Sequence, residues 1–318
     1  MVKIKAFLQV IRLRNLAIIL LIQSLIWLLV LQPFINALQL HASLNYWSVS
    51  LLILSTISIA AAGYIINDYF DVKIDLINKP DKVIIGRIIS PRSAIVLHSV
   101  LNAIGIALVV FVAWDVKAFQ LILIPVVSTL LLWLYATDYK GSYIYGNLIV
   151  AFLTVLSIIM IPLFETSLWQ FFNWNLWVNT AYLNPWFVIG IYSFFAFLLT
   201  WVREIVKDME DYKGDFQQGC ETLPIKYGLK VATQFSQVLL TISIAVILLS
   251  ISKLFLSPWW ILGLYLFIFI CPSLIYLLWK LPKGVSSKHY YNLSQLLKLV
   301  MVLGILALVV LFTLFYNV

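Results

Sequence analysis

Aspartate residues recur in this chain at one fixed spacing. The segment Asn67-Asp68-x-x-Asp71-x-x-x-Asp75 is matched 140 residues later by Lys207-Asp208-x-x-Asp211-x-x-x-Asp215. Ten of the 13 Asp and Glu residues lie in the two short segments 68–81 and 204–221. At about 100° of rotation per helical residue, each aspartate set falls within a sector of roughly 100°. Each set therefore predicts a stripe of carboxylates on one face of a helix.

Such a stripe is unfavourable unless it binds something positive. Like charges at these spacings repel one another. The helix dipole also disfavours anions near a helix C-terminus, where both sets are expected to lie. A hard cation would remove both costs, and ligands that are all oxygen suit Mg²⁺. Because no Cys or His lies near either set, zinc and copper are not expected. The sequence thus predicts Mg²⁺ as the cofactor.

Two acidic stripes that faced each other across a cavity could hold a diphosphate through bridging Mg²⁺. That arrangement would stabilise a diphosphate leaving group while its bond to carbon breaks. The walls of the cavity are expected to be apolar, which suits a long hydrocarbon tail. The chemistry therefore indicates an isoprenoid diphosphate as substrate, with a membrane-soluble acceptor.

The elements that must position these stripes are membrane-spanning helices. Hydrophobic residues make up 63% of the 318 residues and charged residues only 11%, against about 25% charged in an ordinary soluble domain. This composition excludes a soluble globular fold and a disordered chain. A span needs about 20 apolar residues, and nine such stretches are found, near 16–33, 47–66, 93–114, 118–137, 147–164, 186–202, 233–252, 259–279 and 295–316. We expect an all-α polytopic membrane protein, a single domain over 1–318, with its helices around a central cavity open at the cytoplasmic headgroup level.

The basic residues predict how the chain is oriented in the bilayer. The N-terminus and the loops after the second, fourth, sixth and eighth spans hold 19 of the 21 Lys and Arg residues. The positive-inside rule makes that side cytoplasmic, together with both aspartate sets, and leaves the C-terminus outside, in the plasma membrane. The net charge of +8 is explained by this flanking pattern, so no nucleic-acid partner is expected. Oligomeric state is not readable from the sequence.

The two aspartate motifs resemble the signatures of a known family. The string Asn67 to Asp75, reading NDYFDVKID, is similar to the first signature of the UbiA-type intramembrane prenyltransferases. The stretch Arg203 to Asp215, followed by Gly219, Thr222-Leu223-Pro224 and Gly228, is similar to the second. Within that superfamily, the chain looks closest to the geranylgeranylglycerol-phosphate geranylgeranyltransferase type.

The resemblance implies Mg²⁺-dependent transfer of a prenyl group from an isoprenoid diphosphate. It places one metal with the diphosphate on the first motif and a second metal on the second motif. Catalysis would rest on Asp68, Asp71, Asp208 and Asp211, with Tyr139 near the reacting carbon or the acceptor. The residues implied as metal ligands are Asn67, Asp68, Asp71, Asp75, Asp208, Asp211 and Asp215.

Basic and amide side chains near the motifs are candidates for binding substrate. Lys140 could pair with phosphate or serve only as an anchor at the membrane surface. Arg203 could bind phosphate or pair with Glu204. The full set of candidates is Asn67, Lys73, Arg87, Lys140, Asn147, Arg203 and Lys207.

Other interpretations remain open at this stage. The acceptor could be a glycerol-phosphate lipid, an aromatic quinone precursor or a tetrapyrrole. A metal-ion transporter is the alternative from another class, although transporters place ionisable residues near the middle of the bilayer. The Trp-rich segment 165–185 could be a substrate lid or part of an interfacial belt. The small residues between Ser55 and Gly63 predict a close helix–helix contact.

Overall fold

The computed structural model describes residues 2–172, 177–178, 182–283 and 286–315. Within these residues the chain is helical apart from connecting loops and one antiparallel pair of two-residue strands, β1 (Trp177–Val178) and β2 (Tyr182–Leu183). Nine helical segments of the described chain are long and apolar enough to cross a membrane, and each overlaps one predicted span. The predicted all-α membrane architecture is confirmed.

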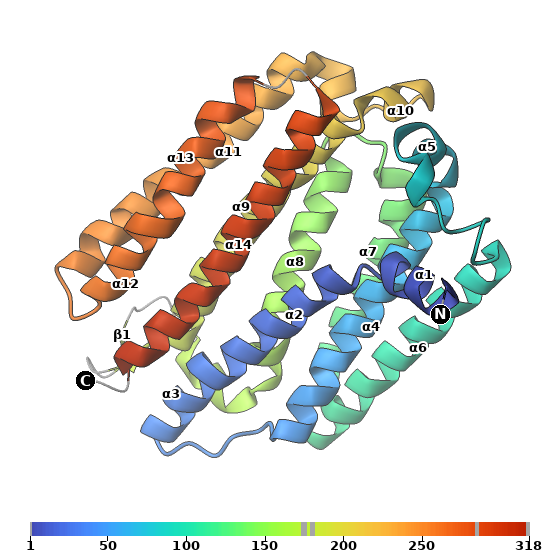
Figure 1. Ribbon diagram of the computed structural model, residues 1–318. Helices are drawn as coiled ribbons and strands as arrows, with labels where there is room; N and C mark the ends of the chain where they lie inside the picture. Colours follow the sequence, from blue (N-terminus) through green and yellow to red (C-terminus); the bar gives the residue numbers. More distant parts are fainter. Residues whose placement is uncertain (1, 173–176, 179–181, 284–285, 316–318) are drawn as a thin grey trace. The chain divides into compact units, whose positions relative to one another are not determined.

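The α-helices follow the chain in one series (Figure 1). They are α1 (Val2–Val10), α2 (Leu13–Ile26), α3 (Gln32–Ala37), α4 (Tyr46–Phe70), α5 (Val72–Asn78), α6 (Pro91–Asp115), α7 (Leu123–Leu134), α8 (Tyr145–Phe164), α9 (Pro185–Glu210), α10 (Tyr212–Gln217), α11 (Leu223–Phe255), α12 (Trp260–Tyr265), α13 (Cys271–Lys280) and α14 (Ser287–Phe315). Short π segments interrupt two of the spans, at η1 (Trp27–Leu31) and η6 (Leu266–Ile270), and end a third, at η4 (Tyr135–Tyr139). Short 3-10 turns complete the series as η2 (Pro80–Lys82), η3 (Phe119–Ile122), η5 (Thr166–Phe171) and η7 (Leu281–Lys283).

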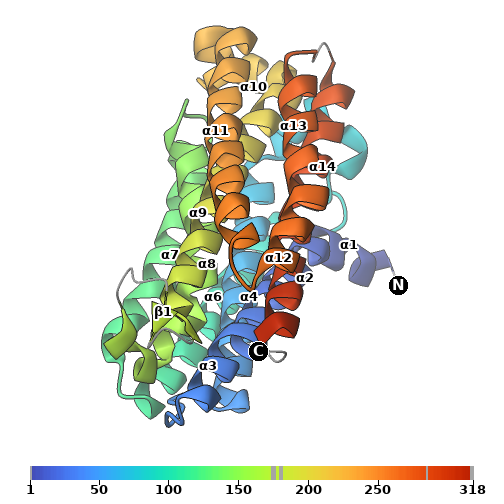
Figure 2. The same cartoon turned by 90° about the vertical axis from the view of Figure 1, so that its left-hand side faces the viewer.

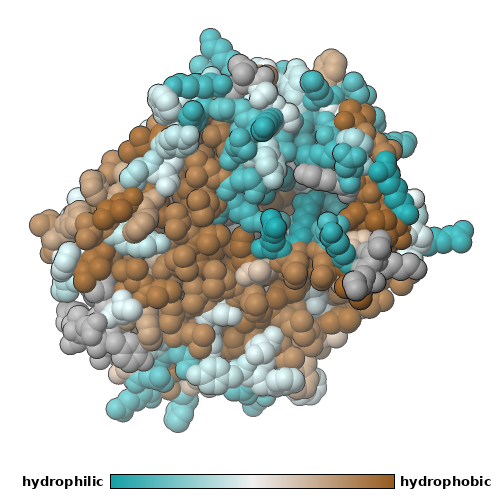
Figure 3. Space-filling view, in the orientation of Figure 1, coloured by the Kyte–Doolittle hydropathy of each residue, from teal (hydrophilic) through white to brown (hydrophobic). Residues whose placement is uncertain are grey.

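The long helices form because an apolar bilayer offers the backbone no hydrogen-bond partners other than its own. Local signals mark where two of them begin. The Asn45 side chain accepts a hydrogen bond from the Ser48 amide at 2.8 Å, and Ser90 accepts one from the Ser93 amide at 3.1 Å. Hydrophobic side chains cover most of the visible sides of the spans, whereas hydrophilic ones gather near their ends (Figure 3).

The described helices group into two compact units. Unit 1 comprises Met1–Lys140 and Val155–Gly190, and unit 2 comprises Gly141–Thr154 and Ile191–Val318. The first aspartate motif belongs to unit 1 and the second to unit 2. The prediction of a single domain over 1–318 stays a prediction.

In unit 1, α4 packs closely along α6. The Ser55 hydroxyl donates to the Gly105 carbonyl at 2.7 Å, and a Cβ atom at Gly105 would lie only 2.6 Å from Ile59. Gly63, eight residues along α4 from Ser55, likewise lies against Leu132 of α7. These contacts confirm that the small-residue run of α4 allows neighbouring helices to approach closely, which holds the helix that carries the first motif.

In unit 2, α11, α13 and α14 run side by side (Figures 1 and 2). The core of the unit includes Val202, Ile205 and Val206 of α9, all fully buried. The Ser287 hydroxyl, at the start of α14, donates to the Glu210 carbonyl at 2.9 Å. This bond places the beginning of α14 at the end of α9, beside the second aspartate motif.

Candidate active site

The first aspartate motif lies at a joint between two helices. Helix α4 ends at Phe70 and α5 begins at Val72, so Asp71 lies between them. A break at Asp71 therefore divides the predicted stripe between two helices. Its consequence for the stripe is small, because the Asp71 amide still donates to the Asn67 carbonyl at 3.0 Å and the Asp75 amide to the Asp71 carbonyl at 2.8 Å. The break falls where the chain leaves the apolar span, and α5 has no buried residue.

Asp71 is the most buried carboxylate of the first motif, with 4% of its surface exposed. It accepts a hydrogen bond from the Asn67 amide nitrogen at 2.7 Å and forms an ion pair with Lys140. The amide oxygen of Asn67 is also buried but has no hydrogen-bond partner among the described residues. The Asn67 amide nitrogen therefore holds Asp71 in place. Because a buried oxygen without a partner is costly, the Asn67 oxygen is an acceptor suited to a cation.

Asp68 is paired with a residue that sequence reasoning assigned no role at the site. The Arg12 guanidinium lies 2.8 Å from the Asp68 carboxylate, and its carbon lies 4.9 Å from the centre of the Tyr64 ring. Arg12 stands between α1 and α2 with a left-handed backbone, φ 52°. The sequence showed Arg12 as one of several basic residues before the first span, and no local pattern distinguishes it from an orientation signal.

The carboxyl group of Asp75 has a raised pKa. Partial burial, together with the neighbouring charges of Asp71 and Asp68, raises its pKa to about 6. The motif therefore holds more negative charge than Lys140 and Arg12 neutralise.

This pKa predicts a pH-dependent response to Mg²⁺. Because the folded-state pKa lies above the ordinary value of 3.8, the metal-free protein loses stability as Asp75 ionises on raising the pH through about 6. A bound cation compensates the ionised carboxylate, so Mg²⁺ should raise the melting temperature more at pH 7 than at pH 5. Thermal unfolding of the purified chain with EDTA and with Mg²⁺ measures this difference. Asp75→Asn should remove most of the pH dependence, and an unchanged dependence in that variant would contradict the assignment.

The second motif repeats the same joint. Helix α9 ends at Glu210 and α10 begins at Tyr212, so Asp211 occupies the position that Asp71 has in the first motif. The Asp211 amide donates to the Lys207 carbonyl at 2.8 Å, and the Asp215 amide to the Asp211 carbonyl at 3.2 Å. Asp215 is buried. The equal spacing in the sequence thus corresponds to an equal local structure.

An asparagine also holds an aspartate of the second motif. Asn147 of α8 is buried, and its amide nitrogen donates to the Asp208 carboxylate at 2.9 Å. The sequence predicted that Asn147 would contact substrate, which stays a prediction; the structure adds its contact with Asp208. It positions this carboxylate much as Asn67 positions Asp71.

The basic residues of the second motif are paired with a glutamate. The Glu204 carboxylate is buried and accepts from Arg203 at 2.8 Å and from Lys207 at 2.6 Å. The pairing of Arg203 with Glu204, one of the two sequence-based alternatives, is the one that the structure shows. The Nε atom of Arg203 is buried without a hydrogen-bond partner in the described part of the chain.

Three further predicted site residues are two substrate contacts, Lys73 and Arg87, and the catalytic candidate Tyr139. Lys73 is exposed on α5. Arg87 donates to the Pro80 carbonyl at 2.8 Å, a hydrogen bond between two residues of the loop that joins α5 and α6. Tyr139 ends η4 with 39% of its surface exposed. The roles assigned to these three residues stay predictions.

The Trp-rich segment has a structural role at the residues that can be described. The Trp186 indole donates to the Leu168 carbonyl and the Trp169 indole to the Leu163 carbonyl, each at 2.9 Å. Trp174 and the Trp177 side chain lie outside the described residues. The lid interpretation therefore receives no support from the described contacts.

The donor set of each motif fits Mg²⁺ with additional oxygen ligands. Among the described residues, no three His, Cys, Asp or Glu side chains lie close enough together to hold a metal ion by themselves. Mg²⁺ typically uses one or two carboxylates and fills its other positions with water and substrate phosphates. The unpartnered Asn67 oxygen and the raised pKa of Asp75 show where the first motif would accept positive charge.

A polytopic helical fold thus carries two matched carboxylate motifs at helix joints, with an asparagine hydrogen-bonded to one aspartate of each motif. The sequence profile of the UbiA prenyltransferase family matches residues 24–296. This chain belongs to that family.

Similar proteins agree with this membership. A digeranylgeranylglyceryl phosphate synthase from Saccharolobus solfataricus is 39% identical over 196 residues, covering 62% of this chain and 61% of the relative. The enzyme of the same name from Methanococcus aeolicus is 32% identical over 255 residues, covering 78% and 79%. The alignment with the Saccharolobus solfataricus relative thus spans about three fifths of the length of that protein.

Solved structures share the fold over almost the whole chain. A structure from work on digeranylgeranylglyceryl phosphate synthase in membranes has a TM-score of 0.64 and 26% identity, and the alignment covers 99% of both chains. A UbiA homologue from Archaeoglobus fulgidus, solved with DMAPP and Mg²⁺, has a TM-score of 0.62 at 13% identity, covering 95% of this chain and 98% of that one.

Proposed function

We propose that this protein transfers a prenyl group from an isoprenoid diphosphate to a prenylated glycerol phosphate lipid and requires Mg²⁺. The observation that carries the proposal is the pair of matched motifs, in which Asn67 braces Asp71 and Asn147 braces Asp208. The names of the relatives supply the substrates. A digeranylgeranylglyceryl phosphate carries two geranylgeranyl groups, so its last prenylation joins geranylgeranyl diphosphate to geranylgeranylglyceryl phosphate.

In this proposal both motifs serve the departure of the diphosphate. Asn67, Asp68, Asp71 and Asp75 would hold one Mg²⁺, and Asp208, Asp211 and Asp215 a second. When bound, Mg²⁺ supplies positive charge that stabilises the leaving diphosphate. The carboxylates provide the anionic environment that the metal needs, and the two asparagines keep the buried carboxylates oriented.

In this proposal, two cationic side chains of unit 1 exchange their carboxylate partners for phosphate oxygens when substrate binds. Arg12 rests on Asp68 and Lys140 on Asp71. Once the carboxylates turn to Mg²⁺, the guanidinium and ammonium groups would be released to make charge-assisted hydrogen bonds with the phosphate oxygens. The ion pairs therefore neutralise Asp68 and Asp71 until the substrate arrives.

The transfer itself exchanges one carbon–oxygen bond for another. The bond between the donor carbon and the diphosphate breaks with its electron pair leaving on the diphosphate. The acceptor hydroxyl oxygen forms an ether bond to the same carbon and loses its proton to a base. The anionic acceptor also needs cations. Lys207 and Arg203, both paired with Glu204, stand about one and two turns before the joint at Asp211.

We also propose that the N-terminus and both motifs face the cytoplasm and that the C-terminus lies outside. The distribution of 19 of the 21 Lys and Arg residues over one set of loops supports this orientation. Soluble isoprenoid diphosphates would then reach the motifs directly from the cytoplasm.

The product of a defined reaction tests the proposed function. The purified full chain in detergent should convert geranylgeranyl diphosphate and geranylgeranylglyceryl phosphate into a product with the mass of the diether. The reaction should stop with EDTA and resume with excess Mg²⁺. An aromatic acceptor such as 4-hydroxybenzoate should give no product under the same conditions. Prenylation of the aromatic acceptor alone would assign the quinone-precursor function, and metal-ion flux in liposomes without any transfer would favour a transporter.

A further inference from the structure

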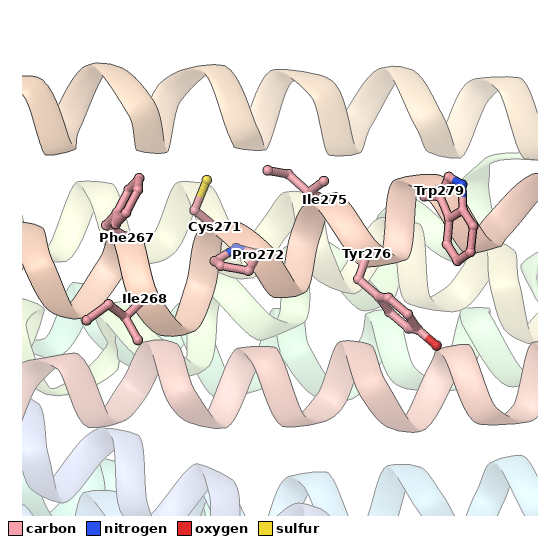
Figure 4. A pocket seen from close by; sticks show the side chains of 7 residues that line it. All are labelled: Phe267, Ile268, Cys271, Pro272, Ile275, Tyr276 and Trp279. Atoms are coloured by element: carbon pink, nitrogen blue, oxygen red, sulfur yellow. The ribbon is translucent and has the colours of Figure 1, made fainter.

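An apolar groove runs along α13 of unit 2 and is lined by none of the residues of the aspartate motifs. It has a volume of about 640 Å³ and is lined by Phe267, Ile268, Cys271, Pro272, Ile275, Tyr276 and Trp279. Phe267, Cys271 and Ile275 project to one side of the helix, whereas Ile268 and Tyr276 project to the other (Figure 4). Most of these side chains are about half exposed, so the groove opens to the surroundings of the unit.

The shape of the groove follows from the local sequence. The helix changes from the π segment η6 to α13 immediately before Pro272, which has no amide hydrogen to donate. Cys271 and Pro272 are small and compact, and larger side chains stand before and after them. The surface is therefore hollowed in the middle and raised at both ends.

The length of the groove matches one leaflet of a bilayer. Phe267 and Trp279 are 12 residues apart, which corresponds to about 18 Å along a helix. Half of a hydrocarbon core of about 30 Å is roughly 15 Å. An extended hydrocarbon chain could therefore lie in the groove from the middle of the membrane to its surface.

One end of the groove is aromatic and positively charged. The Lys283 ammonium lies 3.0 Å from the centre of the Trp279 ring, and the Lys280 ammonium 5.1 Å from it. Neither lysine forms an ion pair with a carboxylate in the part of the chain that the structure describes. Tyr276 and Trp279 have the amphipathic character of side chains at a membrane surface. This end therefore offers two cations to an anion that sits at headgroup level.

We propose that the α13 groove binds one bilayer phospholipid with an anionic headgroup. A hydrocarbon chain of the lipid lies along Phe267 to Tyr276, and its phosphate sits at Lys280 and Lys283. The charge complementarity at one end and the apolar hollow along the rest select such a lipid over a zwitterionic one. The proposal rests on the membrane-spanning fold alone and is independent of the reaction proposed above.

Native mass spectrometry of the full chain in detergent tests the site. The protein is titrated with phosphatidylglycerol and, separately, with phosphatidylcholine of the same acyl chains. We expect one phosphatidylglycerol per chain to bind with a preference on the order of tenfold, because each lysine near a membrane surface favours anionic lipid. The variant Lys280→Gln/Lys283→Gln should lose this preference.

A control of equal charge distinguishes the site from general electrostatics. Lys230→Gln/Lys253→Gln removes two lysines of α11 and should keep the preference of the unmodified protein. A phosphatidylglycerol with a photoreactive group in its chain should label the peptide that contains residues 267–279. Equal binding of both lipids, an equal loss in the control, labelling elsewhere, or a second copy of the chain cross-linked at this face would each overturn the proposal.

Discussion

Replacing Asp208 by Asn is expected to abolish prenyl transfer while leaving the protein folded. The amide nitrogen of Asn147 donates to Asp208 at 2.9 Å, and the side-chain oxygen of an asparagine at position 208 can still accept that bond. The negative charge that Mg²⁺ requires is lost. We expect kcat/KM to fall by roughly 10³-fold, the scale on which removing one preorganised electrostatic contact slows a reaction. Initial rates with geranylgeranyl diphosphate at saturating Mg²⁺ measure the loss.

Asp68→Asn should have the same effect through the first motif, because the motifs are locally alike. Asp81→Asn is the matched control, since Asp81 is exposed in the loop that follows α5 and has no assigned role. Its rate should equal that of the unmodified protein. The melting temperatures of Asp208→Asn and Asp81→Asn should stay close to that of the parent chain, whereas Asp68→Asn also leaves Arg12 without its ion-pair partner and should lower it. Turnover near the parent rate in Asp208→Asn would remove the second motif from the mechanism.

The nine spans were predictable because membrane insertion depends on the length of an apolar run and little on tertiary contacts. The sequence spacing also indicated that both aspartate sets share one local geometry, as the equivalent backbone hydrogen bonds at Asp71 and Asp211 show. The spacing could not predict the joints at Asp71 and Asp211. The hydrogen bonds between residues four apart continue across both joints, so the helical periodicity of the side chains is the same on either side. The aspartate spacing is the same with or without a joint.

The residues that form ion pairs with the carboxylates could not be predicted from the sequence, for a different reason. Arg12 and Asp68 are 56 positions apart, and Lys140 and Asp71 are 69 apart. Such pairs depend on how α1, α4 and η4 pack, and no periodicity in the chain reports that packing. A lysine at the end of a span is expected as an anchor whatever it contacts. The structure shows in addition that Lys140 pairs with a buried aspartate.

Lys140→Ala is expected to weaken binding of the diphosphate substrate and also to destabilise the protein. The variant removes the cation that we assign to the phosphate, so KM for the prenyl diphosphate should rise at least about tenfold, while kcat changes less. It also leaves Asp71, which is buried, without its ion-pair partner. Removing one member of a buried pair is destabilising because an uncompensated charge remains, so the melting temperature without Mg²⁺ should fall.

A second variant separates the two effects. Lys140→Ala/Asp71→Asn removes the uncompensated charge, so it should recover melting temperature relative to Lys140→Ala yet remain inactive, because a metal ligand is also lost. Adding Mg²⁺ should restore melting temperature in Lys140→Ala, where the cation can compensate Asp71, and not in the double variant. Lys230→Ala, on the exposed part of α11, controls for the loss of a lysine as such. A KM unchanged by Lys140→Ala, together with a lower melting temperature, would show that Lys140 only neutralises Asp71 and does not bind substrate.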